Sequence, residues 1–164
     1  MIRKKKLFVR PKKAYETSRI QEENLLVKKY GLKNKKEIWK TTAKVNYFRT
    51  RAKSLANLSQ EEQNVFLNKL KLIGLKTNSL EDVLALKVED LLDRRLSTII
   101  ASKKLSKTTK HARQLIIHKK VLISHKVVNT PSYIVAVEEE HLIKIKPSNK
   151  KVSEEIPAEK MEEN

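Results

Sequence analysis

The sequence predicts an α+β fold: a mainly helical N-terminal part, then a small helix-helix-β-hairpin domain with a short mixed sheet. Apolar residues recur with the 3.6-residue period of helices up to about residue 118, and the period then shortens towards the two-residue alternation of strands. β-rich runs separated by turn residues identify the strand candidates. These are residues 121–123, 126–128, 133–137 and 141–145.

Helix-start and helix-stop residues divide the helical part. Gly31 stands where a C′ glycine ends a helix, and Asn34 with Glu37 three residues later is typical of the start of the next one. Ser18 and Ser59 open two further capping-box patterns, because a hydroxyl there can accept a free amide hydrogen of the first turn. The expected helices cover residues 19–30, 35–57, 60–73, 80–86, 88–102 and 109–118.

Composition divides the chain into four segments. Residues 1–14 alternate cations with apolar residues and show no helical period, which predicts an extended basic arm. Residues 15–93 are expected to form a helical domain, and residues 94–146 a second domain that contains the strands. Residues 147–164 are polar and interrupted by proline, so we expect a disordered tail.

Basic side chains dominate the chain and gather in two blocks. The 164 residues contain 37 Lys and Arg against 19 Asp and Glu, which gives a net charge of +18. Residues 1–53 hold 18 basic and 4 acidic side chains, residues 94–149 hold 12 and 3, and the stretch between them is slightly acidic. Such a charge repels itself in a compact fold, so it favours a polyanionic partner, and its unevenness favours two contact surfaces.

Several function classes lack the residues they require. No apolar run approaches the roughly 20 residues of a membrane span, and no apolar segment follows the basic start as in a secretory signal, so we expect a cytosolic protein without a membrane partner. The chain has no cysteine, and its four histidines lack the close spacing of zinc ligands, so we expect no metal and no other cofactor. Glu138-Glu139-Glu140 is expected to be a solvated loop rather than an acid-base pair, because no apolar setting raises a carboxyl pKa there. We therefore expect no enzyme.

The predicted helix of residues 109–118 has two different faces. At 100° per residue, Ala112, Leu115 and Ile116 share one arc, and polar residues share the opposite one. Thr108 is the expected N-cap, which places free amide groups and the positive end of the helix dipole beside the cations. Such a helix start attracts an anion, and a nucleic-acid backbone is the anion that matches so broad a surface. The polar arc consists of Lys107, Lys110, Arg113 and Gln114.

The predicted helix of residues 35–57 also carries a basic face. A solvated basic face is one interpretation, and the aromatic residues Trp39 and Tyr47 are then ordinary core residues. Cations interleaved with an aromatic ring are also typical of a helix that faces RNA or DNA, because bases stack on such rings. The residues of this face are Lys36, Lys40, Lys44, Tyr47 and Arg51.

The basic arm has two interpretations as well. It is either a disordered chain end or an extended arm that becomes ordered only against phosphates. The second basic block favours the arm, because it implies the same polyanionic partner. The arm's cations that we expect to meet phosphates are Lys4, Lys5, Arg10, Lys12 and Lys13.

Five stretches of the chain together resemble a known family. Residues 94–96, 109–118 and 127–133 are similar to the S-four RNA-binding domain, and residues 29–39 and 88–96 resemble the archaeal branch of the small-subunit ribosomal protein S-four family. The resemblance covers about residues 10–146, and the combination is far more specific than any single motif.

The resemblance implies a structural protein of the small ribosomal subunit. Family members bind a multi-helix junction in the 5′ domain of small-subunit rRNA, nucleate assembly there, and later lie where messenger RNA enters, beside ribosomal proteins S-three and S-five, with an S-five interface that influences decoding fidelity. Carried onto this chain, one set of residues is expected to face rRNA. These residues are Arg95, Lys107, Thr109, Lys110, Arg113, Gln114, His118, Lys119, Lys120, Ser124 and Lys126.

The chain departs from the family pattern in three places. The family hairpin usually turns at Asn-Gly, and Ser124-His125 fits a turn of two positive-φ residues less well. Many archaeal relatives have glycine where Lys119 stands. Many bacterial relatives carry an N-terminal zinc site, which this chain cannot form because it has no cysteine.

An alternative function is an RNA-binding factor for RNA modification or stress response, which requires a catalytic domain for which this chain leaves no room.

Overall fold

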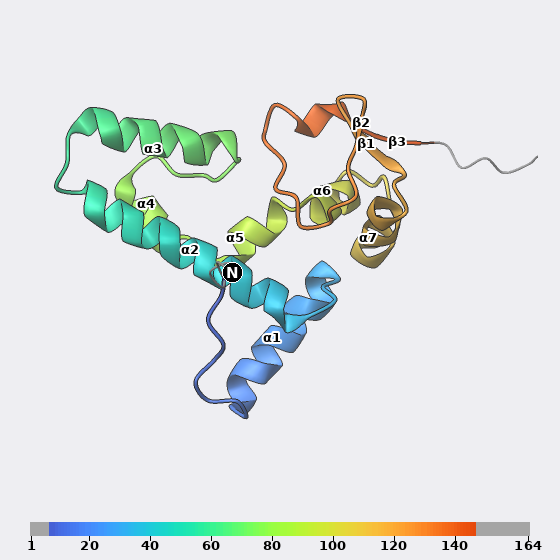
Figure 1. Ribbon diagram of the computed structural model, residues 1–164, viewed down its shortest axis with the longest axis horizontal. Helices are drawn as coiled ribbons and strands as arrows, with labels where there is room; N and C mark the ends of the chain where they lie inside the picture. Colours follow the sequence, from blue (N-terminus) through green and yellow to red (C-terminus); the bar gives the residue numbers. More distant parts are fainter. Residues whose placement is uncertain (1–6, 147–164) are drawn as a thin grey trace, which may run out of the picture.

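The computed structural model describes residues 7–146, which form seven helices and a small sheet arranged around the long helix α2 (Figure 1). Helices α3 and α4 lie along one end of α2, α1 crosses the other end, and α6, α7 and the sheet form a separate body beside them (Figure 1). The elements are α1 (Thr17–Tyr30), α2 (Lys35–Leu55), α3 (Gln60–Leu72), α4 (Leu80–Ala85), α5 (Val88–Asp93), α6 (Leu96–Ser102), α7 (Thr109–Ile117), β1 (Val121–Ile123), β2 (Lys126–Val127), the 3-10 helix η1 (Glu140–Leu142) and β3 (Ile143–Ile145).

Three apolar clusters hold these elements. The first joins the C-terminal part of α2 to α3, α4 and α5, with Ala52, Leu70 and Val83 at its centre. The second joins α6, α7 and the sheet around Ile100 and Ile116. A third, smaller cluster seals the turn between α1 and α2 against α5. The expected apolar arc of α7 therefore finds its partners, and the predicted α+β class is confirmed.

The helix ends agree with the sequence only in part. Gly31 has φ 58° and ends α1, and Thr108 caps α7 by accepting a hydrogen bond from the His111 amide at 3.1 Å, both as predicted. Ser59 precedes α3 but its side chain makes no capping bond, and α1 begins at Thr17, so the capping box at Ser18 is wrong. A side-chain pattern predicts that a helix starts nearby, but solvent can satisfy the same amides.

The predicted helix of residues 88–102 is broken in two. Arg94 and Arg95 separate α5 from α6, and Arg95 has an extended backbone with ψ 144°. The break is fixed from outside, because the Leu96 amide donates to the Tyr133 carbonyl at 2.8 Å and the Arg94 carbonyl accepts from the Val135 amide at 3.1 Å. These partners are about 40 residues away in sequence, so a helical period cannot reveal the break.

The sheet has three strands in the order β2-β1-β3, and both pairings are antiparallel, so the expected mixed sheet is an antiparallel one. Residues 133–137 do not form the expected strand. They make a single bridge, between Ile134 and Arg95, because their backbone groups bond to the α5–α6 junction instead. The hairpin turns at Ser124 (φ 46°) and His125 (φ 70°), so both residues take the positive φ that a type I′ turn requires.

Candidate nucleic-acid interface

The basic face of α2 is exposed along its whole length. Lys36, Lys40, Lys44, Tyr47 and Arg51 are all exposed. The spacing of four residues puts successive lysines about 6 Å apart along the axis. Within residues 7–146 none of the four cations forms an ion pair, so this face carries a row of uncompensated positive charge.

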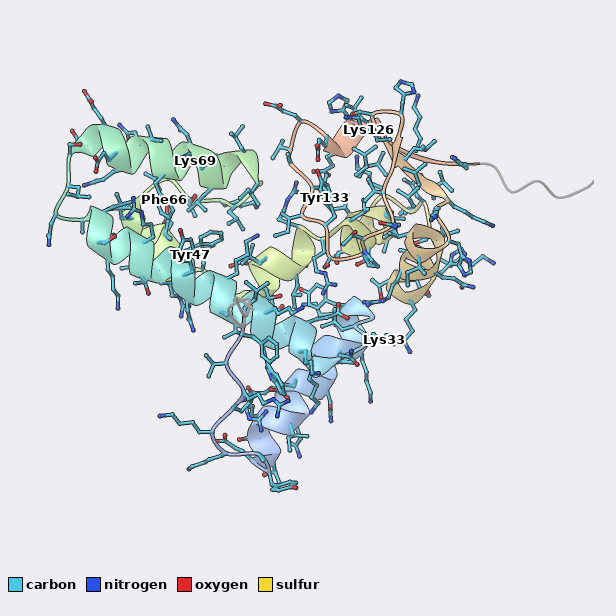
Figure 2. All side chains as sticks on the ribbon, viewed as in Figure 1. Lys33, Tyr47, Phe66, Lys69, Lys126 and Tyr133 are labelled. Carbon is cyan, nitrogen blue, oxygen red and sulfur yellow. The ribbon has the colours of Figure 1, made fainter. Side chains whose placement is uncertain are left out.

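The two aromatic residues of α2 have different roles. Trp39 is half-buried, its Nε1 donates to Glu23 at 2.9 Å, and its ring lies 6.0 Å from that of Phe8. It is a packed residue, as the first of the two interpretations states. Tyr47 lies midway along α2 and is 64% exposed (Figure 2). A tyrosine exposed to this degree on a cationic face provides a surface on which a base can stack.

A half-buried carboxylate, Glu37, joins this face to the second basic block. Arg113 of α7 holds both oxygens of Glu37, at 2.9 and 3.1 Å, and Arg95 donates to it from the α5–α6 junction. Arg95 is 4% exposed and Arg113 is half-buried. The structure thus places two residues that were expected to face RNA inside a three-residue ion cluster. One carboxylate ties α2, the α5–α6 junction and α7 together.

The pKa of Glu37 reflects this cluster. Burial alone raises a carboxyl pKa, but the hydrogen bonds and charges of Arg113 and Arg95 outweigh it and lower the pKa of Glu37 from 4.5 to about 2. Glu37 is therefore ionised in the folded chain at neutral pH. We call the cluster of Glu37, Arg95 and Arg113 the joint. The charge of Glu37 cancels part of the positive charge at the joint, whereas the basic face of α2 and the exposed face of α7 keep their positive charge.

The other predicted residues in and next to α7 differ in what they face. Thr109 turns towards α1, where its hydroxyl approaches the Lys29 carbonyl at 3.5 Å. Lys107, Lys110 and Gln114 are exposed, and neither lysine is ion-paired within the described part of the chain. These three residues remain available to a partner, whereas Thr109 and Arg113 are occupied by the helical part.

Turns after α7 present the remaining predicted residues. His118 caps the helix, and Lys119 follows with φ 57°, in the left-handed conformation that favours glycine. Lys120 is half-buried, and Ser124 and Lys126 are exposed at the hairpin, which lies on the far side of the body from α1 (Figure 2). The hairpin and the end of α7 together form a second cationic surface.

The described part of the arm is irregular but attached to the helices. Arg19 donates to the carbonyls of Lys13 and Ala14 at 2.9 and 3.0 Å, and Phe8 packs near Trp39. Arg10, Lys12 and Lys13 are exposed. Lys4 and Lys5, like the predicted tail, lie outside the described residues.

Arg94 is a second link that the sequence does not reveal. Its guanidinium bonds to the Ile73 carbonyl at 2.9 Å, the Val135 carbonyl at 3.1 Å and Glu140 at 3.0 Å. Glu139 accepts from the Tyr133 hydroxyl at 2.8 Å. Glu138-Glu139-Glu140 was expected to be a solvated loop. This is wrong for Glu139 and Glu140, which both bind other side chains.

One signal in the sequence marks Glu37. It is the only acidic residue between residues 24 and 60, in a strongly basic stretch. A lone carboxylate among many cations is expected to gather arginines. Its partners, 58 and 76 residues away, can be identified only from the fold.

Within residues 7–146, no three His, Asp or Glu side chains gather as metal ligands do, and no helix combines the length and apolarity of a membrane span.

Residues 94–141 match the family model of the S4 domain. Over 172 residues the chain is 37% identical to the small ribosomal subunit protein uS4 of Nanoarchaeum equitans, an alignment that covers 99% of this chain and 95% of that protein. It is 40% identical over 151 residues to the uS4 of Methanothermobacter thermautotrophicus, with 88% of each chain covered. It is 38% identical over 153 residues to the uS4 of Methanocella arvoryzae, covering 85% of this chain and 74% of that protein.

Proposed function

We propose that this chain, which belongs to the uS4 family of small ribosomal subunit proteins, holds small-subunit rRNA through two cationic surfaces. Family membership confirms the S-four resemblance and the expected non-enzymatic role in the cytoplasmic ribosome. It replaces the alternative of a modification or stress factor, because the match extends over nearly the whole chain.

One observation carries the proposal: the basic residues of α2 form an exposed row without carboxylate partners in the described chain. An unpaired row of cations beside a low-dielectric body attracts phosphates and releases their counterions. We name Lys36, Lys40, Lys44, Tyr47 and Arg51 the α2 surface.

The second surface consists of exposed polar residues on α7 and the hairpin. We name these residues, Lys107, Lys110, Gln114, His118, Lys119, Ser124 and Lys126, the hairpin surface. Half-buried Lys120 lies at its edge. Glu37 joins α2 directly to α7. The contacts of Arg94 and Thr109 with the helical part add to this ion cluster in fixing the relative geometry of the two surfaces.

A fixed angle between two cationic surfaces favours a folded RNA over a single strand or a straight duplex. The proposal therefore includes recognition of a junction in the 5′ domain of small-subunit rRNA by its shape, and nucleation of assembly there. It also includes a place near the site where messenger RNA enters, beside ribosomal proteins S-three and S-five, with an effect on decoding fidelity. The resemblance of the motifs supports these finer points.

Titration of a 5′-domain rRNA transcript with the purified full-length chain tests the proposal. We expect log K to fall steeply and linearly with log salt, with a slope of about −1 for each phosphate contact. An unstructured RNA of equal length is the control. A shallow slope would contradict phosphate neutralisation, and equal affinity for the control RNA would contradict junction recognition.

A separate experiment tests the neighbours. We expect the chain to co-sediment with small subunits at high salt, and chemical cross-linking there to join it to proteins S-three and S-five. Cross-links to other proteins alone would exclude the proposed position.

A further inference from the structure

An open pocket of about 600 Å³ lies between α2 and the segment that follows the hairpin. Leu91 and Ile134 contribute apolar lining, and Ser132 adds a hydroxyl from the segment opposite α2. Lys40, Lys44 and Tyr47 of the α2 surface line the helical side. A pocket of this size falls in the range of small-molecule sites, which are mostly apolar with a few polar groups.

The charges around this pocket select an anionic occupant. Its one carboxylate, Glu37, is held by Arg95 and Arg113, whereas Lys40 and Lys44 have no ion-pair partner in residues 7–146. Lys44 lies over the Phe48 ring at 5.9 Å from its centre, and burial there lowers the pKa of Lys44. A cation that is partly desolvated and unpaired gains most from an anion placed beside it.

Leu7 adds to the apolar lining of the pocket.

We propose that this pocket takes one unstacked base of a single-stranded RNA segment, with the base on Tyr47 and the adjacent phosphates on Lys40 and Lys44. The inference rests on the proposed function and adds a specific ligand to its α2 surface. Phosphates need cations and bases need an aromatic or apolar surface, and here both are within one pocket. An acidic peptide has the charge but makes less use of the exposed ring.

Base removal is the direct test. The full-length chain is titrated with a single-stranded RNA hexamer that contains 2-aminopurine, and with the same hexamer made abasic at that position. We expect quenching of the 2-aminopurine fluorescence and roughly tenfold tighter binding of the intact hexamer, the effect of stacking one base. Equal affinity of the two hexamers would overturn the inference, as would displacement of the intact hexamer by an equimolar acidic hexapeptide.

Substitution assigns the effect to the pocket. Tyr47→Ala is expected to abolish the difference between the two hexamers, and Tyr47→Phe to keep it. Both variants should fold, because Tyr47 is 64% exposed. Tyr15→Ala is the matched control, since Tyr15 is 91% exposed and does not line the pocket. An unchanged difference in Tyr47→Ala would exclude Tyr47 as the stacking residue and overturn the inference.

The 5′-domain transcript separates this inference from the proposed function. Steep, salt-dependent transcript binding together with no effect of base removal would leave rRNA binding intact and reject the base pocket. If the chain does not bind the transcript but still binds the intact hexamer more tightly than the abasic one, and this difference depends on Tyr47, the rRNA proposal is rejected and the base pocket is kept.

Discussion

Two helices in the helical half of the molecule, residues 15–93, and two in the half that contains the sheet, residues 94–146, end with the same backbone geometry but with different residues. Helices α1 and α3 are followed by Gly31 and Gly74, with φ 58° and 86°, whereas α6 and α7 are followed by Lys104 and Lys119, both with φ 57°. In all four cases the next amide bonds back to the carbonyl five residues earlier, as in a Schellman motif. Lysine in a left-handed conformation is strained, so the φ angle alone does not explain the choice.

Close packing explains the two glycines. A Cβ on Gly31 would lie 2.9 Å from the Thr109 hydroxyl and 3.0 Å from the Lys110 amide, and a Cβ on Gly74 would lie 2.6 Å from the Arg94 guanidinium. Both glycines face the links between the halves. Lys104 and Lys119 are exposed, so their positions tolerate a side chain and can carry a positive charge. The comparison indicates that glycine is used where the halves meet and lysine where the surface is free.

The largest expected effect comes from breaking the joint itself. Glu37→Gln leaves Arg95 buried beside a neutral partner, and we expect it to lower the free energy of unfolding by about 3 kcal/mol. Urea denaturation followed by circular dichroism measures this. Glu22→Gln is the control, because Glu22 is exposed and forms no ion pair within the described residues. Equal loss in both variants would show that the cluster does not hold the halves together.

The same joint gives a pH dependence. The pKa of Glu37 is lowered in the folded chain, from 4.5 to about 2. Its contribution to stability is therefore present above about pH 4.5 and is lost as the pH falls towards 2. Over this range the unfolding free energy should fall more steeply for the native chain than for Glu37→Gln. Parallel curves would contradict the assignment.

A smaller effect is expected at Gly31. Gly31→Ala combines left-handed strain with crowding against α7, and we expect a loss of about 2 kcal/mol. Lys104→Ala changes a side chain in the same backbone conformation without crowding, and should alter stability by less than about 0.5 kcal/mol. If the loss arises because the joint holds α7 against Gly31, Gly31→Ala should lower the free energy of unfolding by less in the Glu37→Gln background, because α7 can then move away. Full additivity would argue against that cause.

The sequence predicts local features of this fold better than contacts between distant residues. The period and the caps identify α2 and α7 and all five residues of the α2 surface, because a long helix exposes one side whatever its neighbours are. The polar arc of α7 assigns Arg113 to the RNA face, and the family resemblance assigns Arg95 to it, since nothing local shows that Glu37 occupies both residues. The break after Arg94 and the loss of the 133–137 strand have one cause, the bonding of these two segments to each other. The predicted rRNA contacts themselves stay predictions.

The last comparison concerns the two lysines. Lys104→Gly and Lys119→Gly both remove left-handed strain, and after the greater flexibility of an unfolded glycine is subtracted, each should gain roughly 0.5–1 kcal/mol of stability. Only Lys119 belongs to the hairpin surface. We therefore expect Lys119→Gly alone to weaken transcript binding and to reduce the salt slope by about 1, as measured by titration at several salt concentrations. This outcome would mean that the strain at Lys119 is retained because a cation is needed beside the RNA. Equal RNA affinity of the two variants would remove that explanation, and the lysine would then be an exposed residue in a turn that tolerates any side chain.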